Sequence, residues 1–128
     1  MSVTLTVCTT CKYKPLEPFD AEGKSGGMRL AEALEAEAGN RSAQARVIRH
    51  ECLWSCRHHC SVLIRAPGKA GYLVGRFEGG PEAAAAILDW TDAYAQSPGG
   101  KVPYRDWPEG MKGHFILNIP VLAEEEQR

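Results

Sequence analysis

The sequence lacks an excess of charge of either sign, and it lacks any long apolar run. Fifteen lysines and arginines stand against 16 aspartates and glutamates, which gives the 128 residues a formal net charge of -1. A nucleic-acid-binding domain normally shows a basic excess, so we expect no nucleic-acid partner. No stretch approaches the ~18 apolar residues of a membrane span, and the first residues lack the features of a signal peptide. We therefore expect a cytoplasmic protein that does not enter a membrane.

The common motifs of enzymes are missing as well. The glycine-containing segments 24–27 and 68–71 match neither a P-loop nor a dinucleotide-binding fingerprint, because both need a defined strand–loop–helix context. No serine–histidine–acid pattern and no pair of carboxylates stands out. We predict no catalytic residue, and we expect a non-enzymatic carrier in preference to an enzyme.

Five cysteines are the one dense group of chemically active residues. Cys8 and Cys11 form the first cysteine segment, residues 8–11, and Cys52, Cys56 and Cys60 form the second cysteine segment, residues 52–60. With 44% hydrophobic residues the chain can bury a core without disulfides. In a reducing cytoplasm, clustered cysteines are metal ligands or redox thiols before they are structural disulfides, and an odd number fits a disulfide framework poorly.

The rest of the chain reads as alternating strands and helices. A helix is predicted over residues 28–38, ended by Gly39 and Asn40, and a second helix is predicted from Pro81 to the stop signal at residues 97–100. Trp90 and Tyr94 lie four apart on this second helix and are predicted to be core residues. Strands are predicted at residues 3–7, 45–50, 61–65 and 71–77, the last two joined by a proline–glycine turn at residues 66–69.

The order strand, helix, strand predicts how the two cysteine segments meet. A right-handed crossover makes the first two strands parallel, so that both carboxyl ends lie at one edge of the sheet. Cys8 and Cys52 would share that edge, and neighbouring strands are only about 4.8 Å apart. We predict an α/β fold with a mixed sheet and two main helices. It forms a single domain over residues 1–128, with a core at about residues 3–97 and an extension at residues 98–128 that adds an edge strand.

Thiolates gathered at this edge predict a metal site. Four thiolates suit either a tetrahedral zinc or a two-iron cluster, and the sequence leaves both open. We expect Cys8, Cys11, Cys52 and Cys56 to be the ligands. Cys60 is a further metal-ligand candidate: it could be a ligand itself, exchange with Cys56 or Cys11, or be a thiol packed beneath the metal group. The spacing of Cys8 and Cys11 is also that of a dithiol oxidoreductase, although a loop separates the pair from the next predicted helix.

Titratable and positive residues near the cysteines are candidates for a surface that surrounds the site. Arg49, Arg57, His58, His59 and Lys69 belong to this group. Such residues could tune the potential of a metal group or dock an acidic partner. A solvated loop without a role in the site explains them equally well.

The succession of elements resembles the thioredoxin-like [2Fe-2S] ferredoxins. The resemblance is most specific in residues 52–56, Cys-Leu-Trp-Ser-Cys, followed by the strand at residues 61–65. It implies a thioredoxin-like ferredoxin fold, a [2Fe-2S] cluster held by cysteines, electron transfer with a redox partner protein, and a homodimer. The first cysteine segment is shorter than the corresponding loop of those ferredoxins, and this difference leaves the role of Cys11 open.

Nearly the whole chain also resembles a bacterial family of predicted metal-binding proteins. The matching strings are Val-Cys-Thr-Thr-Cys at residues 7–11, Ala-Pro-Gly-Lys at 66–69 and Val-Pro-Tyr-Arg at 102–105. Genes of that family often lie beside cobalamin-biosynthesis genes, so the resemblance implies partners in that pathway. Three functions stay open at this point: an iron–sulfur electron carrier, a protein that handles zinc or cobalt, and a dithiol–disulfide oxidoreductase.

Overall fold

The computed structural model describes residues 3–12, 16–41, 45–53, 60–77 and 80–121. Two long helices are present, α1 (Gly26–Arg41) and α2 (Pro81–Gln96). Two short 3₁₀ helices, η1 (Tyr104–Asp106) and η2 (Glu109–Met111), follow α2. The strands are β1 (Val3–Cys8), β2 (Ala45–His50), β3 (Val62–Arg65), β4 (Gly71–Val74) and β5 (Phe115–Ile119).

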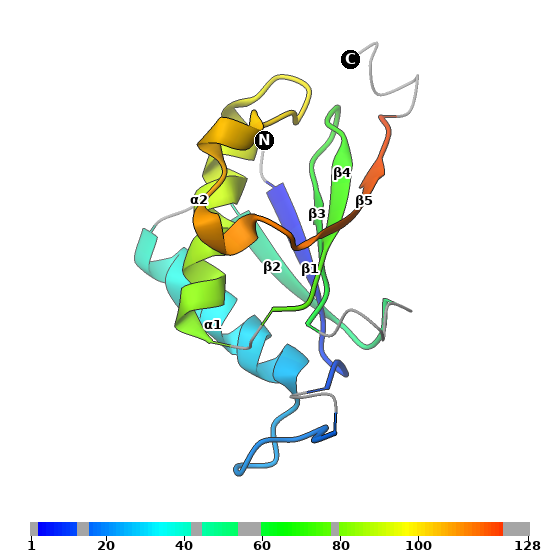
Figure 1. Ribbon diagram of the computed structural model, residues 1–128, viewed down its shortest axis with the longest axis vertical. Helices are drawn as coiled ribbons and strands as arrows, with labels where there is room; N and C mark the ends of the chain where they lie inside the picture. Colours follow the sequence, from blue (N-terminus) through cyan, green and yellow to red (C-terminus); the bar gives the residue numbers. More distant parts are fainter. Residues whose placement is uncertain (1–2, 13–15, 42–44, 54–59, 78–79, 122–128) are drawn as a thin grey trace.

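The strands form one mixed sheet in the order β2-β1-β3-β4-β5. β1 and β2 are parallel, as the crossover through α1 predicted, and every other neighbouring pair is antiparallel. Both long helices lie on the same side of the sheet (Figure 1). The predicted mixed α/β fold with two main helices is therefore confirmed, and β3, β4 and α2 follow the parallel unit in the predicted order.

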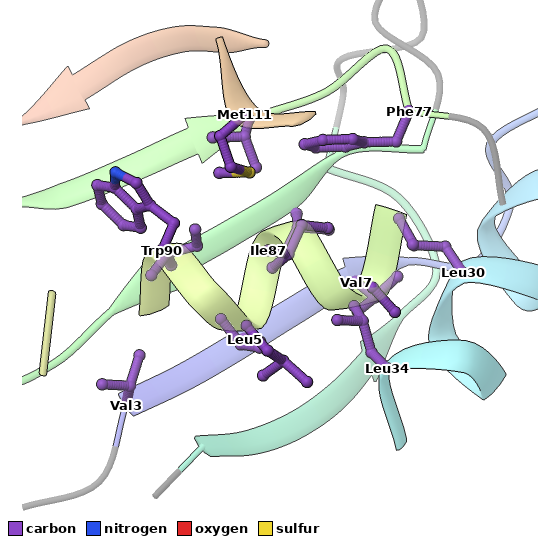
Figure 2. Close-up of a cluster of buried hydrophobic side chains, with 14 of the residues drawn as sticks. Val3, Leu5, Val7, Leu30, Leu34, Phe77, Ile87, Trp90 and Met111 are labelled. Carbon is purple, nitrogen blue, oxygen red and sulfur yellow. The ribbon is translucent and has the colours of Figure 1, made fainter. Parts of the chain in front are cut away.

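The core lies between the sheet and the two helices. In β1, Val3, Leu5 and Val7 are buried and alternate with half-buried threonines, because successive residues of a strand face opposite sides of the sheet. Leu30 and Leu34 of α1 lie one turn apart on the face that meets these valines and leucines (Figure 2).

Helix α2 brings its own apolar face to the same core. Trp90 and Tyr94 are buried, as predicted, and Trp90 stacks on Tyr94 with ring centroids 5.3 Å apart. Tyr72 of β4 packs edge-on against both rings. The predicted edge strand of the extension is β5, which pairs with β4, and Met111 is fully buried in the core. The predicted extension therefore contributes a buried residue to the hydrophobic core.

The predicted boundaries of two elements were wrong. Helix α1 begins at Gly26 and not at Met28, and it runs through Gly39 and Asn40 to Arg41. The fourth strand ends at Val74 and not at residue 77, since the pairing shifts between Leu73 and Val74 and Arg76 takes a left-handed backbone with φ 63°. Among the described residues, no helix is long and apolar enough to cross a membrane.

Candidate metal and thiol site

The parallel pair β1 and β2 places the two cysteine segments at one edge of the sheet, which we call the cysteine edge. The register pairs Val3 with Ala45 and continues without a shift to Cys8 and His50. Cys8 therefore ends β1 directly beside the end of β2, two residues before Cys52. The predicted convergence of Cys8 and the start of the second cysteine segment is confirmed.

Hydrogen bonds continue the pairing beyond the strands. The amide of Thr9 donates to the carbonyl of His50 at 2.8 Å, and the amide of Thr10 donates to the carbonyl of Glu51 at 3.2 Å. The Thr10 hydroxyl donates to the same Glu51 carbonyl. The first cysteine segment is therefore held against the chain that follows β2, and the two segments form one unit although about 40 residues separate them in sequence.

The sulfur of Cys8 is buried, and its polar neighbours come from both cysteine segments. The protonated thiol donates to the carbonyl of Glu51 at 3.7 Å, and the Cys11 thiol is the main donor to the ionised form. The Thr10 hydroxyl lies 3.8 Å from the sulfur. These donors, the Cys11 thiol above all, lower the pKa of Cys8 from 9.0 to about 5, although burial opposes the shift. The site thus stabilises a thiolate at Cys8, and thiolate is the form that binds metals and attacks disulfides.

Cys11 supplies the second thiol of the pair. Its hydrogen is given to Cys8, and this bond and burial raise the pKa of Cys11. The sulfur of Cys11 also accepts a hydrogen bond from the amide of Ser61 at 3.5 Å, and the backbone of Cys60 lies against it. Without a metal, one negative charge is therefore shared within the Cys8–Cys11 pair, since a second thiolate beside the first is disfavoured.

Cys60 lies next to this pair, directly before β3. Its side chain has no exposed surface, and its thiol points to the carbonyl of Lys12 at 4.0 Å. Burial, and to a smaller extent the negative charge at Cys8, raise the pKa of Cys60 to about 12. Cys60 is thus held as a neutral thiol.

The N-terminus of α1 packs directly against the first cysteine segment, which the predicted intervening loop did not lead us to expect. Gly27 donates its amide to the carbonyl of Cys11 at 3.2 Å. A Cβ at Gly27 would lie 1.9 Å from the carbonyl oxygen of Cys8, so only glycine allows this approach. The helix therefore begins at the glycines because they let its first turn touch the cysteine backbone, and its positive end lies beside the thiols.

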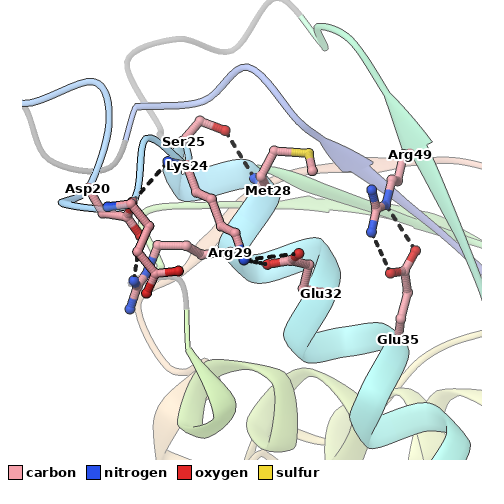
Figure 3. A network of polar contacts seen from close by, with 9 residues as sticks. Asp20, Lys24, Ser25, Met28, Arg29, Glu32, Glu35 and Arg49 are labelled. Carbon is pink, nitrogen blue, oxygen red and sulfur yellow. Dashed lines mark hydrogen bonds and ion pairs between the residues drawn. The ribbon is translucent and has the colours of Figure 1, made fainter.

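Ser25 caps this helix and ties it to the same segment. Its hydroxyl accepts from the amide of Met28 at 3.1 Å (Figure 3), and it donates to the carbonyl of Thr9 at 2.5 Å. The sequence prediction missed Ser25, although a serine before two glycines and a helix is a recognisable N-cap signal.

Ion pairs hold the loop that leads from Cys11 to α1. Asp20 accepts from the amides of Glu22 and Lys24, each at 2.9 Å, and pairs with Arg29 of α1 at 2.7 Å. The hydrogen bond from Arg29 and those from the two backbone amides lower the pKa of Asp20. Figure 3 shows these contacts on the first turns of α1. They fix the end of the loop relative to the helix and, through the helix, relative to the thiols.

The expected surrounding of positive groups is only partly present in the described residues. Arg49 lies near the cysteine edge, but it pairs with Glu35 of α1 at 2.6 and 3.0 Å. Lys69 was wrongly placed: it lies in the β3–β4 turn at the opposite end of the sheet, because β3 runs antiparallel to β1 and carries the chain away. Its ammonium donates to the carbonyls of Tyr94 at 3.0 Å and Ala95 at 2.6 Å, where it caps α2.

The predicted ligands are only partly described. Cys52 is half-buried, and its amide donates to Nδ1 of His50 at 3.3 Å. Cys56 lies outside the described residues, as do Trp54, Arg57, His58 and His59. Within the described part of the chain, no three histidine, cysteine or acidic side chains gather closely enough to hold a metal ion. The thiols that the structure describes are the Cys8–Cys11 pair, Cys52 after β2, and Cys60, whose thiol lies against the Lys12 carbonyl.

The comparisons with known proteins can be set against this geometry. A family model described as "Protein of unknown function (DUF1636)" matches residues 5–121. The chain belongs to this family. The match covers both cysteine segments, both long helices and all five strands except the first residues of β1. No curated protein and no solved structure matches the chain.

Proposed function

We propose that the cysteine edge binds a [2Fe-2S] cluster through Cys8, Cys11, Cys52 and Cys56 and that the protein carries single electrons. One observation carries the proposal: Cys8 ends β1 beside the end of β2, where the amides of Thr9 and Thr10 bond the first cysteine segment to the chain that leads to Cys52. Sulfur held by several donors at the end of two parallel strands is the environment that a thiolate-bound metal group needs.

The described residues fit the sulfur chemistry of such a group. Cys8 is stabilised as a thiolate and interacts with the Cys11 thiol, so these two side chains would serve as ligands of the required type. A bound cluster would supply the one-electron change. The chain would supply ligation, exclusion of water by the buried pair, and an N–H donor at the Cys11 sulfur from Ser61, which favours the more negative, reduced state.

The proposal includes partners and a place in the cell. An electron carrier needs a redox partner protein, and the resemblance to proteins linked with cobalamin biosynthesis makes enzymes of that pathway the proposed partners. A homodimer is proposed on the same ground. We place the protein in the cytoplasm, where its free thiols would stay reduced.

Anaerobic purification followed by an absorption spectrum and by iron, sulfide, zinc and cobalt analysis tests the proposal. We expect a red-brown protein with equal iron and sulfide. Cys8→Ser and Cys52→Ser should each lose the cofactor, while Gly39→Ala, at a position in α1 with open space around it, should keep it. Colourless protein with one bound zinc, or protein with bound cobalt, would contradict the iron–sulfur proposal and support a metal-handling function.

A dithiol–disulfide oxidoreductase is the second candidate, and a specific contact favours it. Cys8 and Cys11 touch, Cys8 has a lowered pKa, and the N-terminus of α1 lies beside them. Cys8 would attack a partner disulfide and release one partner thiol. Cys11 would then attack Cys8, release the second thiol and leave an intramolecular disulfide. Metal-free protein that oxidises and reduces reversibly, with a 2 Da change in peptide mass, would support this candidate.

A further inference from the structure

Cys60 has an unusual backbone. Its φ is 59°, in the left-handed region that side chains with a Cβ disfavour, and Arg76 is the other non-glycine residue with positive φ in the described part of the chain. Such a conformation persists only where the surroundings enforce it, and it often marks a functional site. At Cys60 the surroundings are the first cysteine segment, α1 and the start of β3.

The left-handed turn determines where two successive amides point. The torsion angles of residue 60 lie between the amide of Cys60 and the amide of Ser61. The Ser61 amide donates to the sulfur of Cys11 at 3.5 Å, and the backbone of Cys60 lies against the same sulfur. In an extended backbone, successive amides point to opposite sides. With residue 60 left-handed they converge, in the manner of the backbone nests that bind anions. The Ser61 carbonyl meanwhile accepts from the Cys8 amide at 3.1 Å, so the turn is tied to both members of the thiol pair.

The thiol of Cys60 is engaged elsewhere. It lies against the Lys12 carbonyl and belongs to the buried core. A Cβ placed on Gly26 would come within 2.8 Å of the Cys60 sulfur, which shows how closely the first turn of α1 covers it. The Cys60 side chain is therefore packed against the Lys12 carbonyl and the first turn of α1.

We infer that Cys60 is a positioning residue and not a metal ligand: its left-handed backbone aims the amides of residues 60 and 61 at the Cys11 sulfur. The inference rests on the proposed metal site and settles the role of the fifth cysteine. Because N–H donors stabilise added negative charge on a ligand sulfur, the nest raises the reduction potential of a bound cluster.

Three variants separate this role from ligation. Cys60→Gly removes the thiol and adopts a left-handed backbone freely, so we expect wild-type metal content, an unchanged sulfur-to-metal absorption band and an unchanged potential. Cys60→Val keeps a side chain of similar size but resists the left-handed region, so we expect a lower potential and a shifted band. Cys60→Ala, which is small and disfavours this region less, should lie between them and serves if the valine variant does not fold.

Two results would overturn the inference. Loss of metal in Cys60→Gly to the level of Cys8→Ser would make Cys60 a ligand. An unchanged potential and absorption band in both the alanine and valine variants would show that the backbone of residue 60 does not act on the cofactor.

The amide resonance of Ser61 provides a test that does not need metal. In the metal-free protein, Cys11→Ala should shift this resonance upfield by removing its acceptor, and Cys60→Gly should leave it in place. If these shifts appear and no metal group is found, the proposed function fails while the nest stands. If Cys11→Ala leaves the Ser61 resonance unchanged, the nest itself is refuted.

Discussion

Replacing Gly27 with alanine tests the contact between α1 and the first cysteine segment. Within a helix, a change from glycine to alanine normally stabilises the protein by roughly 0.5–1 kcal/mol. At Gly27 the new Cβ would lie 1.9 Å from the carbonyl oxygen of Cys8 and 2.9 Å from the backbone of Cys8 and Thr9, where ordinary contact begins at 3.4 Å. Because these are backbone atoms, no side chain can rotate away, and helix and segment must separate.

The expected cost follows from that separation. The hydrogen bond from the Gly27 amide to the Cys11 carbonyl is strained or lost, which costs about 1 kcal/mol. Overpacking typically costs about 1–3 kcal/mol more. We expect Gly27→Ala to lower the free energy of unfolding by about 2–4 kcal/mol. Gly39→Ala, in the same helix with nothing within 4 Å of the new Cβ, should raise it by up to about 1 kcal/mol.

Equilibrium urea unfolding, followed by helical circular dichroism, measures both variants under one set of conditions. The opposite signs of the two changes are the decisive result, because helix propensity alone predicts the same sign. If Gly27→Ala is as stable as the wild type or more stable, α1 does not begin against the cysteine backbone, and the description of the site is wrong.

Three further results are expected. Lys69→Met should lower the free energy of unfolding by about 1–3 kcal/mol, because it removes the buried donor to the last carbonyls of α2. Urea unfolding measures the loss. An unchanged free energy would mean that water satisfies these carbonyls. In metal-free protein, thiolate absorbance at 240 nm should show that Cys8 ionises well below its ordinary pKa of 9.0. The pKa of Cys8 should rise in Cys11→Ala. Titration of all thiols near 9 would contradict the contact between the two sulfurs. The lowered pKa of Asp20 means that its pairing with Arg29 contributes stability above about pH 4. Asp20→Asn should therefore be less stable than the wild type at pH 7, and the difference should disappear as pH falls below 3.8. A difference that is constant with pH argues against the ion pair.

Local sequence patterns were sufficient for the order of the strands and for the meeting of Cys8 with the start of the second cysteine segment. The alternation of apolar residues in β1 and the helix that follows it implied a parallel partner strand, and the parallel register then brings Cys8 beside His50. These inferences need only the period of a strand and the handedness of a crossover, both of which are local or general rules.

The helix boundaries could not be predicted in this way. In the sequence, Gly26 and Gly27 look like turn residues. Glycine is needed there because the helix approaches the backbone of another part of the chain too closely for a Cβ. Gly39 and Asn40 read as a stop, but Arg41 extends the helix by pairing with Glu37 at 3.3 Å and with Asp89 of α2 at 2.5 Å. Tertiary contacts outweigh the local preference at both ends.

The finer arrangement of the site was also hidden. Nothing near Cys60 in the sequence shows that its backbone is left-handed or that Ser61 donates to a sulfur fifty residues earlier. Lys69 was assigned to the site by its proximity in the chain, whereas the hairpin carries it to the other end of the sheet. The sequence therefore predicted that Cys8 lies at the sheet edge where the second cysteine segment begins, but not which groups surround the sulfurs.

X-ray absorption at the edge of the bound metal tests most directly whether thiols of both cysteine segments hold one group. We predict a first shell of sulfur at about 2.3 Å in the anaerobically purified protein. Cys8→Ser and Cys52→Ser should each lose the metal and with it this shell, while Cys60→Gly should leave it intact. A first shell without sulfur, or one that neither serine variant changes, would contradict the proposed site.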